Sequence, residues 1–465
     1  MRPLGLLQYL GYGAGDAANN LAFSMSALFL LLYYTDVAGI PAVAVGTLFL
    51  LVRVWDAASD VLAGRIVDAT MTRWGKFRPF LLFGSVPLLL LSVAVFSVPS
   101  SWSFELKLVY AYVSYGLLGL FYSLVNIPYG SLAAAMTQVP EERAKLASFR
   151  VVGANATGLM LALVVAPQIS GSGNLQQSLT LTTLALVVVG MALYLFTFLT
   201  AREQVQRDVA KVSMRQSFAT LRHNQPLLML CASSLMFLTG WFSLQTVGAF
   251  YARNVLGDAN LYIPITLLQN VGTFVAAALV PRLVERIGKK VTYMAGGAIA
   301  IVSGIGLIAA PGSVPALAIA IFGVLGFGLG AVNTLMWAIE ADTVDYGEWK
   351  TGVRTEGITY AMFSFTRKMG QALGGAAAAY TIGFGGYVAA AGLNQSESAV
   401  LSIKLAAGLV PTVFIAIALL SMAFYPLTEA RYREIVAAIA ARRVAHAAVA
   451  APSPRPLLQS PAAAE

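Results

Sequence analysis

Charged residues, cysteine and histidine are all scarce in this sequence. Charged side chains make up 11% of its 465 residues and hydrophobic ones 58%, whereas a soluble domain has about 25% and about 45–50%. These fractions exclude a soluble enzyme, a disordered chain and a secreted disulfide scaffold. The single cysteine, Cys231, excludes an internal disulfide and gives no metal signal.

Catalytic motifs are missing as well. The two histidines, His223 and His446, lie in a central loop and in the C-terminal tail. The sequence has no H-E-x-x-H motif, no phosphate-binding P-loop and no Ser/His/Asp arrangement. We therefore expect neither an enzyme nor a bound cofactor.

Long apolar runs, by contrast, fill most of the chain. Twelve membrane helices of about 20 residues need roughly 240 residues, which this length accommodates. The runs predict an all-α polytopic membrane protein whose twelve helices form two six-helix halves, at 1–200 and 226–425, with a central loop at 201–225 and a partly disordered tail at 426–465. The predicted spans are 8–35, 42–66, 80–98, 106–135, 147–167, 179–200, 226–251, 260–281, 291–310, 314–338, 355–388 and 402–425.

Lysine and arginine gather in the loops on one side of these spans. The loop after the second span carries Arg73, Lys76 and Arg78, and the loops after the fourth, sixth and eighth spans are also basic. The other side has few basic residues, among them Arg253. The positive-inside rule therefore places the basic side, both termini, the central loop and the tail in the cytoplasm of a cell (inner) membrane protein. The formal charge of +9 is explained without a nucleic-acid partner.

A short motif after the second span recurs after the eighth. Residues 65–68 (RIVD) precede residues 73–76 (RWGK), and residues 282–285 (RLVE) precede residues 286–289 (RIGK). The recurrence indicates a six-plus-six duplication. It resembles the basic loop between the second and third helices of each half in the major facilitator superfamily.

Two charged clusters are candidates for a cytoplasmic gate. An acid at a helix end can pair with a basic loop, hold the two halves together and release them when the halves rock. The alternatives are charge that only sets topology and a solvated acidic cluster. The gating candidates are Asp68, Arg73, Lys76 and Arg78 near the second span, and Asp342, Asp345 and Glu348 at the end of the tenth.

Six further blocks carry a closer resemblance. They are YYTDV at 33–37, RVWDAASD at 53–60, RWGKFRP at 73–79, NIPYGSL at 126–132, DTVDYGE at 342–348 and RTE at 354–356. Together, from about Tyr9 to about Tyr387, they resemble the glycoside–pentoside–hexuronide:cation symporters, the melibiose-permease-like family of the major facilitator superfamily. The resemblance implies the major facilitator fold and symport of a sugar with Na⁺, H⁺ or Li⁺ by alternating access.

Asp56 and Asp60 lie four residues apart inside the second span. They share one helix face, about 6 Å apart at Cβ, and repel each other. Carboxylates inside a span are costly and indicate function, and a bound cation or a shared proton relieves the repulsion. The alternative is a structural pair held by Arg53. The resemblance implies that Asp56 and Asp60 hold the coupling ion, Na⁺ or H⁺, and that Ser123 adds a hydroxyl.

Lys368 lies well inside the eleventh span and needs an acidic partner. We expect Lys368 to occupy Asp56 and Asp60 when the cation is absent, or to link the cation and sugar sites. The alternative is snorkelling to the membrane interface. The resemblance places the family's essential lysine here, whereas the neighbouring Arg367 is expected to face another helix or a lipid headgroup.

Polar side chains in the first, fourth, fifth and eleventh spans suit a sugar. Asparagine offers a donor and an acceptor, tyrosine a ring for a pyranose face and arginine several fixed donors. The alternatives are helix–helix hydrogen bonding for asparagine and an interface anchor for arginine. The resemblance implies a sugar-site arginine at position 150. The sugar-binding candidates are Asn19, Asn20, Tyr122, Asn126, Arg150 and Lys368.

The sugar site departs from that of the melibiose permease. This chain has Asn20 and Asn126 where that permease has carboxylates, and Gly130 where it has tryptophan. We therefore expect a non-galactosidic substrate, either an anionic hexuronide or a neutral glucoside or xyloside. A lysolipid or another amphipathic solute is the alternative substrate for a carrier of this fold. The expected partners are a sugar, a monovalent cation and the lipid bilayer, and the protein is expected to be a monomer.

Overall fold

The computed structural model describes residues 3–137, 139–171, 173–204, 224–352 and 356–450, apart from the side chains of some helix residues. Within these ranges the chain is helical, with one isolated β-bridge between Thr72 and Gly75. The helices are α1 (Leu6–Leu32), α2 (Ala42–Ala69), α3 (Ser85–Val95), α4 (Phe104–Met136), α5 (Pro140–Gly171), α6 (Leu175–Thr200), α8 (Gln225–Phe250), α9 (Tyr262–Ile287), α10 (Lys289–Ala309), α11 (Pro315–Thr351), α12 (Glu356–Phe384), α13 (Glu397–Ala407), α14 (Leu409–Ala423) and α15 (Glu429–Ala450). The predicted all-α class is confirmed.

Ten helical segments of the described chain are long and apolar enough to cross a membrane. The predicted span 80–98 is instead a short apolar helix, Phe80–Val95, and α12 is not among the ten. Large apolar side chains such as Val188 and Leu420 remain exposed on the outside of the helices, as expected where helices face lipid. The chain is thus a multi-span membrane protein, while the count of twelve spans stays a prediction.

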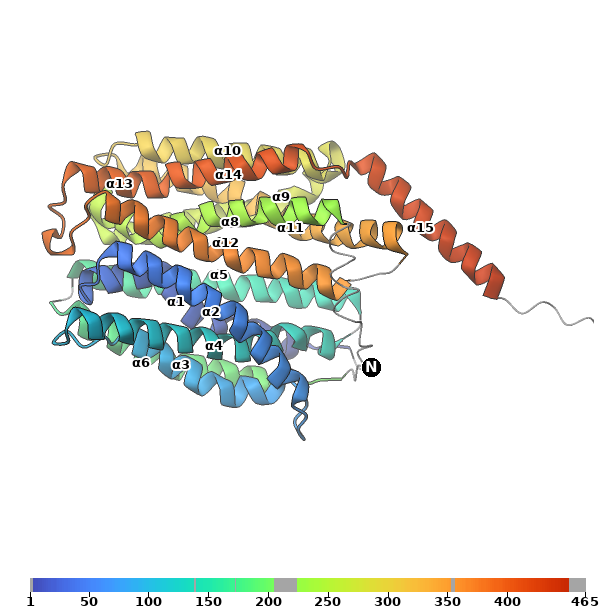
Figure 1. Cartoon of the computed structure of the whole chain (residues 1–465), viewed down its shortest axis with the longest axis horizontal. Coiled ribbons are helices and arrows are strands. Elements are labelled where there is room, and N and C mark those ends of the chain that lie inside the picture. The colour runs from blue at the N-terminus through green and yellow to red at the C-terminus, as the bar shows by residue number, and fades with distance from the viewer. Residues whose placement is uncertain (1–2, 138, 172, 205–223, 353–355, 451–465) are drawn as a thin grey trace, which may run out of the picture.

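The helices pack as two sets. In the N-terminal set (α1–α6), α1 packs against α5 and α6, and α2 against α4; in the C-terminal set (α8–α14), α8 packs against α12 and α14, and α11 against α9 and α10. Across the boundary α2 meets α12, α1 meets α8 and α5 meets α9. Figure 1 shows both sets running along a common direction, with α15 extending beyond one end.

The two ends of the bundle carry different loops. We call one the basic end; it carries residues 70–79, the start of α10 and α15. The opposite end carries residues 38–41, 97–103 and 256–258. Helices α2 and α12 run in opposite directions between these ends, because α2 starts at the opposite end and α12 at the basic end.

The two sets repeat a turn at the opposite end. Helix α1 continues into a π turn at Tyr33–Val37, and α8 continues into one at Tyr251–Val255. Each turn is followed by a glycine with positive φ, 73° at Gly39 and 83° at Gly257. Because other residues rarely adopt this backbone conformation, the sequence can turn sharply only with glycine here.

A carboxylate clamps the basic loop of each set. Glu203, after α6, accepts the backbone N–H groups of Lys76 at 2.9 Å and Phe77 at 2.8 Å. Glu429, at the start of α15, accepts the N–H of Lys289 at 3.2 Å. Free N–H groups at a helix start carry partial positive charge, which favours a carboxylate. Each basic loop is therefore fixed by an acid that follows the last long helix of its own set.

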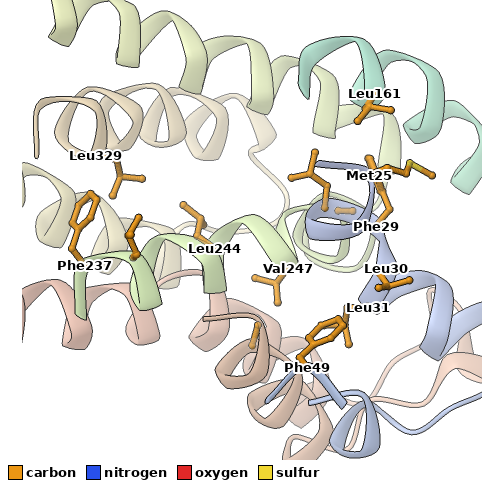
Figure 2. Packing of buried hydrophobic residues seen from close by; sticks show 14 of the residues in the cluster. Met25, Phe29, Leu30, Leu31, Phe49, Leu161, Phe237, Leu244, Val247 and Leu329 are labelled. Atoms are coloured by element: carbon orange, nitrogen blue, oxygen red, sulfur yellow. The ribbon is translucent and has the colours of Figure 1, made fainter. Parts of the chain in front are cut away.

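Buried apolar side chains fill the boundary between the two sets. Figure 2 shows labelled residues of α1, α2 and α8, including Phe29, Phe49 and Val247, gathered where the sets meet. Glycine allows close approach within a set: a Cβ on Gly153 of α5 would lie 2.4 Å from the carbonyl oxygen of Gly13 in α1. This packing holds the polar residues described next on facing helices.

Candidate functional site

Asp56 of α2 has one oxygen paired and one oxygen without a partner among the described residues. Arg53, one turn earlier, donates to Asp56 Oδ2 at 3.0 Å. The other oxygen, Oδ1, is buried and accepts no hydrogen bond from the described residues, and the hydroxyl of Ser59 in the same turn is also buried without a partner there. A Cβ on Gly119 of α4 would lie 2.0 Å from Asp56 Oδ1. Because Gly119 has no side chain, there is room at this position for Asp56 Oδ1, the oxygen without a partner among the described residues.

Asp60, one turn further along α2, bonds to one residue of each set of helices. Ser123 of α4 donates to Asp60 Oδ1 at 2.6 Å. Lys368 of α12 forms an ion pair with the other carboxylate oxygen. The side chains of Asp60 and Lys368 are 24% and 32% exposed, so solutes can reach this pair. Lys368 thus points to an acid of the other set and not to a membrane interface.

A cavity lies between the two sets beside Asp56. Its wall contains Asp56 of α2, Tyr122 of α4, and Gln371 of α12, three residues after Lys368. Tyr122 stacks on Phe23 of α1 with ring centroids 5.6 Å apart. Arg53, Tyr115 and mostly small or apolar residues of α1, α2, α4, α8 and α12 complete the wall. An aromatic wall with a few polar groups is typical of a small-molecule site.

Arg150 of α5 is neutralised by an acid of α1. Its Nε donates to Asp16 Oδ1 at 2.8 Å, and the side chains are 38% and 6% exposed, respectively. Asn20 donates from Nδ2 to Asp16 Oδ2 at 3.0 Å and accepts from Ser24 at 3.0 Å. The Arg150 guanidinium also lies 5.5 Å from the ring centre of Tyr129. The partly exposed donors of Arg150 can therefore bind hydroxyl groups without adding an uncompensated charge.

The other predicted sugar-binding asparagines differ in their surroundings. Asn19 is buried, and its Oδ1 accepts the hydroxyl of Tyr194 in α6 at 2.7 Å, so it faces the interior of the N-terminal set. Asn126 is partly exposed and makes no hydrogen bond with another described side chain. The geometry therefore groups Asn20 with Arg150 and leaves Asn19 in helix packing, while the sugar-binding roles stay predictions.

At the opposite end, a buried network joins the two sets. Arg253 forms an ion pair with Asp36, and the side chains are 18% and 5% exposed. The hydroxyl of Tyr387 lies 2.9 Å from both carboxylate oxygens of Asp36. The hydroxyls of Thr47 and Tyr380 also meet across the boundary at 2.9 Å. We call Asp36, Arg253 and Tyr387 the latch; it closes this end of the bundle.

The basic residues expected to act in a gate contact their own set. Arg78 donates from Nε to the carbonyl oxygen of Phe198 at 3.1 Å and lies 4.4 Å from the centre of that ring. Arg73 and Lys76 lie over the aromatic rings of their neighbours in sequence. The side chain of Asp68 lies outside the described residues.

The acidic gate candidates also contact their own side of the boundary. Asp342 accepts Lys289 Nζ at 2.7 and 2.6 Å. Asp345 accepts the hydroxyl of Tyr432 in α15 at 2.8 Å, and burial together with this bond raises the pKa of Tyr432. Glu348 is partly buried nearby on α11. The bonds described for these acids lie on one side of the boundary, and the gate roles stay predictions.

Several of these residues have no role predicted from the sequence. Asp16 lies inside the first span, and the cost of a buried carboxylate was a signal that could have identified it. Ser59 lies between the two aspartates and could have been noted on the same helix. Glu203, Asp36 and their partners are far apart in the chain, so no local pattern indicates their pairing.

Comparisons with known proteins agree with this architecture. Residues 11–429 match the family described as MFS/sugar transport protein. The chain is 48% identical to the "Glucuronide carrier protein homolog" of Escherichia coli, covering 93% of this chain and 95% of that protein. It is 35% identical to a "Putative sulfoquinovose importer" of Salmonella typhimurium (95% and 94% covered) and 33% identical to the "Isoprimeverose transporter" of Lactiplantibacillus pentosus (89% and 87%).

Solved structures share the fold at low sequence identity. The nucleoside transporter NupG superposes with a TM-score of 0.64 at 11% identity, covering 91% of this chain and 100% of that one. A bacterial homolog of the human lysosomal transporter Spinster, inward-facing and occupied, has a TM-score of 0.65 at 12% identity, covering 90% and 95%. Identities this low relate only the folds.

Proposed function

Because the chain belongs to the MFS/sugar transport family of membrane transporters, we propose that it carries a sugar together with a cation by alternating access. The chain resembles the glycoside–pentoside–hexuronide symporters, and the family match and the relatives confirm this resemblance. The relatives' names include both acidic and neutral sugars. The names alone therefore do not select a substrate class for this chain.

The ion pair between Asp60 and Lys368 carries the proposal. It links α2 to α12 across the boundary, beside the free oxygen of Asp56 and the hydroxyl of Ser123. Within the described ranges, no group of three or more His, Cys, Asp and Glu side chains could hold a metal ion. Two carboxylates and hydroxyls nevertheless suit Na⁺, and the same carboxylates accept H⁺.

Coupling follows from competition for Asp60. An ion bound at Asp56 and Asp60 displaces Lys368 and breaks a bond between the sets, whereas an empty site recovers that bond. An ion thereby shifts the equilibrium between conformations by the difference in its affinity for them. Asp56 keeps its ion pair with Arg53, and Asp60 is neutralised either by the ion or by Lys368, which avoids an unpaired carboxylate inside a membrane.

The latch supports an inward-open state as the conformation described here. Asp36, Arg253 and Tyr387 close the opposite end. By the positive-inside rule, the basic end and both termini are cytoplasmic. We place the protein in the cell inner membrane as an importer that releases its load at the basic end.

Uptake by right-side-out membrane vesicles tests the proposal. The probes are radiolabelled methyl β-D-glucuronide and methyl β-D-glucoside, driven by a Na⁺ gradient in one set of vesicles and by a pH step in another. The wild type should accumulate at least one probe under one gradient, and Asp56→Asn and Asp60→Asn should abolish accumulation because no ion is held. Asp258→Asn removes an exposed loop carboxylate and serves as the matched control.

Two results would overturn the proposal. Undiminished accumulation by both aspartate variants would remove the cation site. Uptake of a radiolabelled lysophospholipid, with no uptake of either sugar under any gradient, would establish the alternative of an amphipathic-solute carrier.

A further inference from the structure

Four described cationic side chains lie well inside α2, α5 and α12, and one of them has no carboxylate partner among the described residues. The three paired cations are Arg53 with Asp56, Arg150 with Asp16, and Lys368 with Asp60. Arg367 of α12 makes no ion pair within the described ranges. An unpaired charge in such surroundings is unfavourable. Among the described side chains, Arg367 is therefore a cation that no carboxylate neutralises, and an anionic ligand would stabilise it.

Neutral groups hold the Arg367 guanidinium in place. Nη2 donates to Asn333 Oδ1 of α11 at 2.9 Å, and Nη1 contacts Met336 Sδ at 3.5 Å. The guanidinium carbon lies 4.9 Å from the ring centre of Trp337 and 5.6 Å from that of Phe363. A guanidinium has five N–H donors, and these contacts use only part of them. The group is thus oriented in advance, with donors left for a ligand.

Partly exposed aromatic rings lie beside Arg367. Trp337 stacks on Tyr360 with ring centroids 5.8 Å apart, and the two residues are 39% and 50% exposed. Tyr360 is close enough to interact electrostatically with Arg367 and also with Arg150 of the other set. Tyr360 is therefore near both guanidinium groups, and Arg367 lies four residues, about one helical turn, from Gln371 in the cavity wall.

The two arginines differ in charge balance and therefore in what they can recognise. Arg150 is neutralised by Asp16, so it suits hydroxyl groups. Arg367 has a full positive charge and a planar fork of donors, which fits a carboxylate in a bidentate manner. The rings of Trp337 and Tyr360 offer apolar faces to a pyranose beside it.

We propose that Arg367 binds the carboxylate of a sugar acid and makes this carrier selective for hexuronides over neutral glycosides. The inference rests on the proposed sugar transport and names its substrate class. The carboxylate supplies the missing partner of Arg367, while Arg150 donates to ring hydroxyls from the other set. A bound hexuronide thereby touches both sets at once.

Competitive binding to purified protein in detergent tests the proposal. The probes, p-nitrophenyl β-D-glucuronide and p-nitrophenyl β-D-glucoside, differ only in the carboxylate. The wild type should bind the glucuronide at least tenfold more tightly. Arg367→Gln should remove most of that preference and leave glucoside affinity within about twofold, because a charged hydrogen bond is lost for one ligand only. Arg367→Lys should retain part of the preference.

A second variant keeps the guanidinium and supplies an internal competitor. Asn333→Asp places a carboxylate at the position that now accepts from Nη2, and it should also abolish the preference. Arg150→Gln should weaken both ligands equally and serves as the comparison. An unchanged glucuronide-to-glucoside ratio in Arg367→Gln and Asn333→Asp would overturn the role of Arg367 and leave sugar transport intact, whereas a wild type that binds neither sugar would overturn both proposals.

Discussion

The ion pairs Asp36–Arg253 and Asp60–Lys368 both join the N-terminal and C-terminal sets, and their surroundings differ. Asp36 and Arg253 are 5% and 18% exposed, and Tyr387 supplies further hydrogen bonds to the same carboxylate. Asp60 and Lys368 are 24% and 32% exposed and lie beside a cavity and a free carboxylate oxygen. Solutes are thus excluded from the Asp36–Arg253 ion pair, whereas they can reach the Asp60–Lys368 ion pair.

This difference separates a bond that holds a conformation from a bond that a ligand can replace. Removing one partner of a buried, well-bonded pair leaves a charge without compensation. A half-exposed pair can instead exchange its cation for another. Substitutions in both regions test this contrast.

Lys368→Met should abolish sugar accumulation and raise the apparent affinity for the coupling cation about tenfold. The ion binds more readily because the lysine that competes for Asp60 is gone. The empty carrier, however, cannot neutralise Asp60 and therefore cannot return to its outward-facing state. Sugar binding titrated against Na⁺ and against pH measures the affinity. Lys290→Met removes a lysine at the basic end as a control. A cation affinity equal to that of the wild type would show that Lys368 does not compete for the site.

Arg253→Met should open the opposite end. The probe is Thr47→Cys in a Cys231→Ser background, labelled from outside whole cells with a membrane-impermeant maleimide. Loss of a charged hydrogen bond worth about 1.5–3 kcal/mol should raise the labelling rate at least tenfold. Arg253→Lys keeps the charge and should recover part of the protection. Equal labelling rates with and without Arg253 would mean that the latch does not hold this end closed.

Gly119→Ala should weaken cation coupling without unfolding the protein. A Cβ at this position would lie 2.0 Å from Asp56 Oδ1, so the carboxylate must turn away from its present position. Gly116→Ala is a matched control three residues earlier, because its Cβ would meet Trp55 at an ordinary 3.6 Å. The cation concentration for half-maximal uptake should rise roughly fivefold in the first variant only, a cost of about 1 kcal/mol. A similar rise in both variants would point to helix packing and not to Asp56.

Tyr387→Phe should loosen the latch by the smallest amount. It removes the tyrosine hydroxyl that donates to Asp36 and leaves the ion pair between Asp36 and Arg253 intact. A hydrogen bond worth about 1 kcal/mol corresponds to roughly fivefold faster labelling of Thr47→Cys. Tyr380→Phe, which removes a hydroxyl beside position 47 and leaves the latch intact, provides a comparison. A larger effect of Tyr387→Phe than of Arg253→Met would reverse the ranking of these contacts.

The fold was predictable because helices that face lipid produce a clear pattern of apolar runs in the sequence. Apolar runs and basic loops indicate membrane helices and their alternation, and the all-α class followed from them. The number of spans was harder to predict, since the predicted span 80–98 is a short helix here. Length and hydropathy alone do not decide such a case.

The candidate site was predictable where residues share one helix or where a charge inside a span required a partner. Asp56 and Asp60 are four apart, and the cost of Lys368 inside a span required an acid. Asp36 and Arg253 are separated by 217 residues, and Asp16 and Arg150 by 134. No periodicity within one helix connects such pairs, because their contact depends on how the helices pack.

The clamps at Glu203 and Glu429 have a consequence for biosynthesis. Glu203 follows Lys76 by 127 residues, and Glu429 follows Lys289 by 140. A ribosome must therefore complete nearly all of a set before its basic loop can be fixed. Each half acquires this restraint as a late event of its own insertion, so the first half can be fastened while the second is still being translated.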